Sequence, residues 1–170
     1  MTRSPESLTI RLAHTDDIEG TRTLLNEIIR SGGTTAITNE LSVDEMREWF
    51  ISGDNVVSCF AAVDAGGAIV GFQSLSTHGV SRAGWVDIAT FASRSRHQSG
   101  VGSALFAPTR EAAARLGFAT MNASIRVDNV GGLAYYEKMG FETYLVEAGD
   151  PQAQGRAFNR EHKRFDLLRT

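Results

Sequence analysis

The chain has 170 residues, of which 42% are hydrophobic and 22% charged, and its formal net charge is −3. This length predicts one domain over residues 1–170, and the composition is that of an ordinary globular protein. Nucleic-acid-binding proteins usually carry an excess of Lys and Arg, so no nucleic-acid partner is expected. No apolar run approaches the ~20 residues of a membrane span, and residues 1–7 lack the apolar stretch of a secretory signal. We therefore expect a cytoplasmic protein without a membrane partner.

The first part of the chain predicts a strand followed by two helices. Residues 8–13 alternate apolar and polar side chains, as a half-buried strand does. Thr15 is the predicted cap of the helix that follows, and Gly32-Gly33 ends it. The apolar stripe of this helix comprises Ile18, Leu24, Leu25, Ile28 and Ile29. Ser42 and Glu45 form a capping box for a short second helix, in which the residues expected to face inward are Met46, Trp49 and Phe50.

The rest of the chain alternates strands and helices. Strands are predicted at residues 56–63, 68–76 and 85–92, and the first two are joined by a glycine-containing hairpin turn. A helix at 101–116, a strand at 118–125, a helix at 131–139 and strands at 141–147 and about 158–168 follow. This order predicts an α/β (α+β) fold with a mixed, mostly antiparallel central sheet, helices on both faces and a core at about 8–147. The single cysteine, Cys59, is expected to be a buried structural thiol.

A glycine-containing loop opens the helix at 101–116. Its sequence is His97-Gln-Ser-Gly-Val-Gly102. Glycines let the backbone approach a ligand closely, and the free N–H groups at a helix start suit a pyrophosphate. A plain strand-to-helix turn would have the same pattern, and the loop lacks the third glycine of a dinucleotide-binding turn.

A second segment, Asn129-Val-Gly-Gly-Leu-Ala-Tyr-Tyr-Glu-Lys-Met-Gly-Phe141, follows one strand later. By itself it is an amphipathic helix with a glycine cap. Together, the two segments resemble the last two motifs of the GCN5-related N-acetyltransferase (GNAT) superfamily. The matching residues are Gly100, Gly102, Asn129, Tyr136, Gly140 and Phe141. More narrowly, residues 33–36 and 43–50 resemble the phosphinothricin and methionine-sulfoximine acetyltransferase branch.

This resemblance implies the single-domain GNAT fold and acetyl-CoA as the co-substrate. The pyrophosphate is expected at the glycine loop, and the pantetheine arm along the end of the strand at 85–92. The implied cofactor-binding residues are Thr90, Phe91, Ala92, His97, Gln98, Ser99, Gly100, Val101, Gly102, Ser103 and Asn129.

Two positions depart from the family pattern. His97 stands where the family has Gln or Arg, so that a neighbour supplies the usual contact or the loop is shifted by one residue. Gly131-Gly132 stands where the family often has Arg-Ala, which removes a cation from the start of the helix.

Two residues are the candidates for acid–base catalysis. Asp87 falls where the phosphinothricin branch has a catalytic glutamate, and burial in its strand would raise its pKa toward a useful range. It is predicted to be the general base, acting directly or through water; the alternative is a structural acid on the strand. Tyr136 is the candidate general acid toward the leaving thiolate, and the alternative is a packed aromatic ring. Its neighbour Tyr135 is expected to belong to the core.

The predicted reaction is acetyl transfer to the primary amine of a small molecule, with amino-acid analogues such as phosphinothricin or methionine sulfoximine as the sharper prediction. Thr34 and Thr35 are expected to shape the acceptor pocket. Arg82 is expected to pair with a substrate carboxylate, or else to be a solvated loop residue. The alternatives are acetylation of a protein or peptide and a sensor that binds acyl-CoA without turnover. No metal is expected, since the histidines are scattered, and residues 150–164 are interpreted as a solvated hairpin or a homodimer contact.

Overall fold

The computed structural model describes residues 7–79, 82–94, 100–153 and 157–169. The strands are β1 (Thr9–Leu12), β2 (Val56–Val63), β3 (Ile69–Ser76), β4 (Trp85–Ala92), β5 (Thr120–Arg126), β6 (Glu142–Glu147) and β7 (Arg160–Asp166). The helices are α1 (Ile18–Ser31), α2 (Val43–Met46), α3 (Val101–Arg115) and α4 (Val130–Lys138). Short helical turns occupy Thr15–Asp17, Arg47–Ile51 and Leu167–Arg169.

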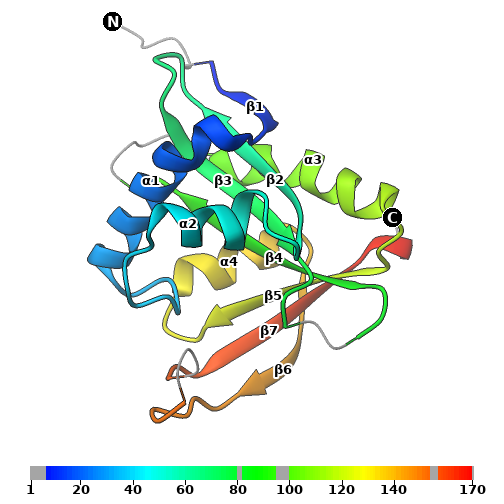
Figure 1. The fold of residues 1–170 in the computed structure, drawn as a ribbon. Coiled ribbons are helices and arrows are strands. Elements are labelled where there is room, and N and C mark those ends of the chain that lie inside the picture. Colours follow the sequence, from blue (N-terminus) through cyan, green and yellow to red (C-terminus); the bar gives the residue numbers. More distant parts are fainter. Residues whose placement is uncertain (1–6, 80–81, 95–99, 154–156, 170) are drawn as a thin grey trace, which may run out of the picture.

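All these strands form one seven-stranded sheet in the order β1-β2-β3-β4-β5-β7-β6 (Figure 1). Every neighbouring pair is antiparallel except β4 and β5, which are parallel. The predicted mixed, mostly antiparallel sheet is confirmed. The C-terminal strand β7 inserts between β5 and β6, so the order in space differs from the order along the chain.

Helices cover both faces of the sheet, as predicted (Figure 1). The residues of α1 and α2 pack on Phe72 of β3, whereas α3 and α4 pack on Leu75 of the same strand. The two side chains point to opposite faces because successive residues of a strand alternate. Gly71 lets α3 approach the sheet, since a Cβ there would lie 2.5 Å from the Val101 side chain.

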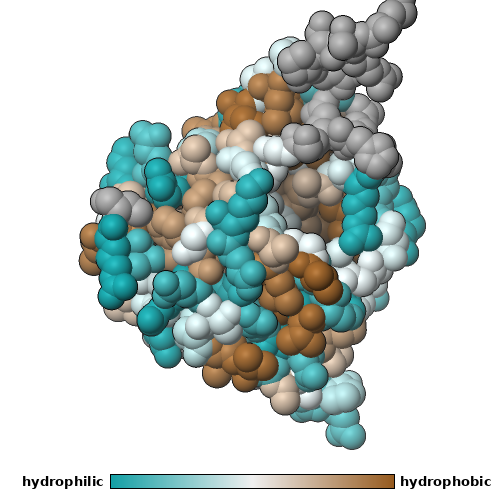
Figure 2. Space-filling model, turned by 180° about the vertical axis from the view of Figure 1, so that it is seen from behind, coloured by the Kyte–Doolittle hydropathy of each residue, from teal (hydrophilic) through white to brown (hydrophobic). Residues whose placement is uncertain are grey.

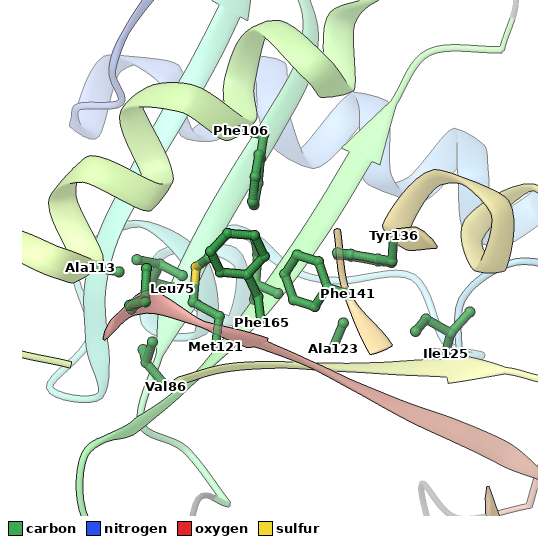
Figure 3. Packing of buried hydrophobic residues seen from close by; sticks show 12 residues of the cluster. Leu75, Val86, Phe106, Ala113, Met121, Ala123, Ile125, Tyr136, Phe141 and Phe165 are labelled. Atoms are coloured by element: carbon green, nitrogen blue, oxygen red, sulfur yellow. The ribbon is translucent and has the colours of Figure 1, made fainter. Parts of the chain in front are cut away.

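Under α3 and α4, three phenylalanines form the centre of the core. Phe106, Phe141 and Phe165 have ring centroids between 5.4 and 5.8 Å apart (Figure 3). On the face seen in Figure 2, hydrophobic residues form separate patches among hydrophilic ones. Such scattered exposed apolar groups are usual on a folded protein.

The start of α1 differs from the prediction. Thr15 does not cap the helix but lies in the helical turn that precedes it. The position before the helix belongs to Asp17, whose carboxylate accepts the His14 N–H at 2.9 Å. The same carboxylate accepts two hydrogen bonds, of 2.7 and 2.8 Å, from Arg11. Asp17 therefore ties β1 to α1, a role that depends on a partner from the preceding strand.

The start of α2 has the predicted capping box, in which Ser42 and Glu45 each accept the other's backbone N–H. Met46 and Phe50 are buried as predicted. The prediction that Trp49 faces inward is wrong, since 46% of this residue is exposed. After α2 the chain widens into a π turn, in which the Ser52 N–H donates to the Arg47 carbonyl. A wider turn advances each residue by a smaller angle, and this turns Trp49 away from the sheet.

None of the helices in the described part of the chain is both long and apolar enough to cross a membrane.

Candidate active site

The parallel strands β4 and β5 separate after only three paired residues. Their register runs from Trp85↔Thr120 to Asp87↔Asn122. Beyond this point a cleft of about 510 Å³ opens between them. β4 contributes residues 88–92 to its walls and β5 contributes residues 124–126. The sheet is thus divided at its centre, where an extended ligand can lie.

Beyond Asp87, the edge of β4 that faces this cleft pairs with no strand of the described residues. The Ser93 N–H donates to the Val70 carbonyl at 2.8 Å, on the β3 side. Backbone groups of an antiparallel pair alternate between inward and outward, so those of Thr90 and Ala92 point away from β3. They face the cleft, where they can pair with a ligand as an added strand would.

Gly100 and Gly102, the two glycines of the loop, lie at the start of α3 beside the cleft. Gly100 adopts φ 94°, a left-handed conformation that favours glycine. The first N–H to bond within α3 is that of Ala104, to the Gly100 carbonyl, so the amides of residues 101–103 have no bond within the helix. Gly102 lines the cleft beneath Tyr135, and a Cβ at this position would lie 2.7 Å from that ring. His97, Gln98 and Ser99, also predicted to bind the cofactor, lie outside the described residues.

The two tyrosines of α4 differ in burial, and Tyr135 packs against the edge of the core that contains Tyr136. Tyr136 is the more buried, at 6% exposure, and its ring packs against Phe141 with centroids 5.0 Å apart (Figure 3). Its hydroxyl lies 2.8 Å from Thr90 Oγ1, at the wall of the cleft. Tyr135 is only half-buried, also lines the cleft, and donates its hydroxyl to the Gly102 carbonyl at 2.8 Å. Burial raises the pKa of the Tyr136 hydroxyl, which therefore stays protonated at neutral pH.

Asp87 lies at the point where the strands separate, on the other face of the sheet from Thr90. The Asn122 side-chain amide donates to Asp87 Oδ1 at 2.7 Å, and the Tyr144 hydroxyl donates to Asn122 Oδ1 at 2.7 Å. Burial raises the pKa of the Asp87 carboxyl, and the hydrogen bond from Asn122 opposes that rise. A proton-accepting carboxylate is therefore held in a fixed position and is harder to ionise than an exposed one.

Asp87 lines a smaller cavity of about 210 Å³, next to Trp49 and Ser76. This cavity shares part of its lining with the larger cleft. The shared residues are Phe50, Ile88, Ala89 and Ser124. The two spaces thus meet at the gap between β4 and β5. The smaller one lies on the face that α1 and α2 cover, and the larger one is lined by residues from both faces.

Thr34 and Thr35 line the larger cleft and are held there by residues from the end of β5 and the start of α4. Asn129 donates to the Thr34 carbonyl at 3.1 Å, and Arg126 donates to the Thr35 carbonyl at 3.0 Å. The segment between α1 and α2 is thereby fastened over the cleft.

Asn129 also caps α4, because its Oδ1 accepts the Gly132 N–H at 2.9 Å. A Cβ at Gly132 would lie 2.4 Å from the Asn129 amide nitrogen. Glycine at this position, a departure from the family pattern, leaves room for the asparagine to fold over the helix start.

Arg82 lines neither of these two cavities. Its guanidinium lies over the ring of Trp85, at 4.8 Å from the centroid, and 5.8 Å from that of Tyr144. Substrate binding by Arg82 stays a prediction. Cys59 is buried, and burial raises the pKa of its thiol to about 12, as expected of a structural cysteine. Among the described residues, no three His, Cys, Asp or Glu side chains gather as metal ligands would.

Three residues of the site were not predicted from the sequence: Gln73, Asn122 and Arg126. Each is a polar residue within a strand, where local pattern gives no sign of a partner. Their partners come mainly from other strands, from α4 or from the segment between α1 and α2. Register and strand order were needed to find them.

Comparisons with known proteins agree with this geometry. The model of the "Acetyltransferase (GNAT) family" matches residues 24–141. The chain belongs to this acetyltransferase family, as predicted. A curated relative, "Putative phosphinothricin acetyltransferase YwnH" of Bacillus subtilis (strain 168), is 26% identical over 94% of this chain and 95% of its own length.

Solved structures of similar proteins have the same fold. A "putative phosphinothricin N-acetyltransferase" has a TM-score of 0.79 and 26% identity, covering 95% of this chain and 99% of that one. The phosphinothricin acetyltransferase of Sinorhizobium meliloti, solved in complex with acetyl-CoA, has a TM-score of 0.78 and 23% identity, with coverages of 94% and 88%. The resemblance to the phosphinothricin branch is therefore supported as well.

Proposed function

We propose that this protein transfers the acetyl group of acetyl-CoA to the primary amine of a small molecule. One observation carries the proposal: Asp87 and Tyr136 lie on opposite faces of the sheet beside the gap between β4 and β5. Family membership and the acetyl-CoA-bound relative support the identity of the donor.

The chain's own residues fit acetyl-CoA. The amides of residues 101–103, which make no hydrogen bond within α3, suit the pyrophosphate, and the edge groups of Thr90 and Ala92 suit the amides of the pantetheine arm. Gly100 and Gly102 have no side chain beside these amides, and a Cβ at Gly102 would lie 2.7 Å from the Tyr135 ring. Contacts from Phe91, Val101, Ser103 and Asn129, and from His97, Gln98 and Ser99, are part of the same proposal.

Acetyl-CoA supplies a thioester, whose carbonyl carbon the amine attacks and whose sulfur leaves. Asp87 accepts the proton that the amine gives up, directly or through water. An outward N–H of β4 donates to the carbonyl oxygen as negative charge develops on it. Tyr136 donates its proton, or a hydrogen bond, to the departing sulfur, and exchange with solvent restores both side chains. Holding the reactants side by side contributes several kcal/mol, since well-oriented reactions gain about 7–11 kcal/mol.

For the acceptor, we propose an amino-acid analogue such as phosphinothricin or methionine sulfoximine. Support comes from the names of the relatives. The amine would enter the cavity that Asp87 lines, with Thr34 and Thr35 shaping the neighbouring cleft and Arg82 facing a carboxylate. A cytoplasmic location and a homodimer also stay proposals that are based on the sequence.

The test is release of free thiol from acetyl-CoA with a panel of amines. The panel would contain amino-acid analogues, polyamines and a peptide with a free N-terminus. The proposal expects turnover with a small amine and little with the peptide. Calorimetric binding of acetyl-CoA without thiol release for any amine would instead indicate a sensor.

A further inference from the structure

Gln73 is a buried polar residue in the middle of β3, and it is not among the residues that line the cleft. It is 0% exposed and pairs across the sheet with Thr90, so the two side chains share one face. Its amide nitrogen donates to Thr90 Oγ1 at 2.8 Å and to the Tyr135 hydroxyl at 3.1 Å. Its Oε1 atom is buried and has no hydrogen-bond partner among the described residues.

An apolar side chain would avoid this unmet acceptor. A buried polar group with an unsatisfied atom costs folding free energy, and such groups in a native protein call for an explanation. Both hydrogens of the Gln73 amide are used, and both point to the hydroxyl groups beneath α4. We therefore look for the role of Gln73 in its hydrogen bonds to Thr90 and Tyr135.

The donations set the direction of the neighbouring hydrogen bonds. An amide N–H can only donate, so the Tyr135 oxygen accepts the hydrogen bond from Gln73. The hydroxyl hydrogen of Tyr135 is donated to the Gly102 carbonyl. Thr90 Oγ1 must also accept from Gln73. Its other neighbours are the Tyr136 hydroxyl at 2.8 Å and the Tyr135 hydroxyl, which already accepts from Gln73. A hydroxyl that already accepts one hydrogen bond is a stronger donor, which favours Thr90 donating to Tyr136.

We infer that Gln73 is a positioning residue, which acts through Thr90 to leave the proton of Tyr136 free for the departing sulfur. This inference rests on the proposed function, since it assigns a role within the same site. When Thr90 donates to the Tyr136 oxygen, the Tyr136 hydroxyl can turn its hydrogen toward the cleft. The same hydrogen bond stabilises the tyrosinate that remains after the proton leaves. Gln73 itself touches neither the thioester nor the amine.

The test is a double-mutant cycle between Gln73 and Tyr136. Gln73→Met keeps the length of the side chain but removes the donated hydrogens. We expect its kcat to fall about tenfold, a part of what a positioned acid contributes. The KM for acetyl-CoA should stay within about twofold. In the Tyr136→Phe background, the same substitution should lower kcat less than about twofold, because the group it positions is gone.

Two further variants separate this role from a general effect on folding. Thr90→Val removes the connecting hydroxyl, so it should lower kcat as Gln73→Met does, without adding to it. Thr109→Val removes a different buried hydrogen bond, from Thr109 to the Leu105 carbonyl in α3, and should leave kcat unchanged. Thermal unfolding of each variant checks that it is folded.

The outcomes separate the inference from the proposed function. If Tyr136→Phe lowers kcat but Gln73→Met acts equally in both backgrounds, or not at all, Gln73 does not position Tyr136 while the proposed function stands. If Tyr136→Phe keeps the wild-type kcat, or if the wild type releases no thiol with any amine, the acid or the activity is wrong and the assignment of Gln73 falls with it.

Discussion

Asp87 and Asn122 are joined by a hydrogen bond of 2.7 Å at the last paired position of β4 and β5, immediately before the strands separate. The pairing holds the carboxylate at the mouth of the gap, and the Tyr144 hydroxyl holds the asparagine in turn. The Asp87 carboxyl is half-buried, with one amide donor and no ion pair among the described residues. Such a group is poised to exchange a proton.

Asp87→Asn should lower kcat/KM by roughly 10²- to 10⁴-fold with the best amine, the usual contribution of a positioned base. The amide keeps the size of the side chain but cannot accept the proton. Calorimetry should show unchanged acetyl-CoA affinity, since the β4 backbone and the glycine loop are untouched. The matched control is Asp44→Asn, which changes an exposed carboxylate on α2. Near-normal activity of the Asp87 variant would mean that the base lies elsewhere.

Asn122→Ala should move the ascending limb of the pH profile of kcat/KM to higher pH. The base works only when ionised, so activity is lost as pH falls through its pKa. Burial raises that pKa and the Asn122 amide lowers it, and removing the amide takes away the largest effect that opposes the rise. The amine's own ionisation gives a similar limb, so the variant and the wild type are compared with the same amine. The exposed Asn55→Ala serves as control, and coincident profiles would contradict a role for Asn122.

Gly100→Ala should weaken acetyl-CoA binding, as measured by calorimetry. At φ 94° an alanine is strained by about 1–2 kcal/mol, and relief of the strain would turn the loop amides away from the ligand. Gly117→Ala is a closely matched control, because Gly117 has φ 85° at the other end of α3 and, like Gly100, has no atom within 4 Å of its added Cβ. Both variants should lose stability, but only Gly100→Ala should lose affinity. Equal affinities would place the pyrophosphate elsewhere.

Asp17→Asn should lower the free energy of unfolding by about 2 kcal/mol near neutral pH, a typical value for a buried hydrogen bond to a charged group. Arg11 holds the pKa of Asp17 below its usual range. A carboxyl with a lowered folded-state pKa stabilises the protein above its unfolded pKa, and the contribution disappears as pH falls through the folded value. Denaturant titrations should therefore show the difference from wild type shrinking below about pH 4. Asp16→Asn, at an exposed neighbouring carboxylate, should have little effect at any pH; a constant loss for Asp17→Asn would exclude the ion pair as its cause.

The element order, the apolar stripe of α1, the Ser42–Glu45 capping box and the turn at Gly100 all followed from the sequence. Each depends on side chains within a few residues of one another, so periodicity and turn chemistry suffice to predict it. Family motifs added the acetyltransferase class. Two local predictions were wrong: that Thr15 caps α1 and that Trp49 faces inward. Arg11 binds Asp17 at the start of α1, and a π turn after α2 turns Trp49 outward, and the local pattern predicts neither.

The partners within the site were decided by the tertiary structure alone. Asp87 meets Asn122 because β4 and β5 are parallel in one register, and a shift of β5 by one residue would send Asn122 to the opposite face of the sheet from Asp87. Gln73 reaches the hydroxyl next to Tyr136 only because β3 pairs with β4 and α4 packs above them. A sequence specifies which residues prefer a strand or a helix. The hydrogen bonds of Gln73 join residues that are 17 and 62 positions apart in the sequence, so they depend on the order of the strands and on the packing of α4 against the sheet.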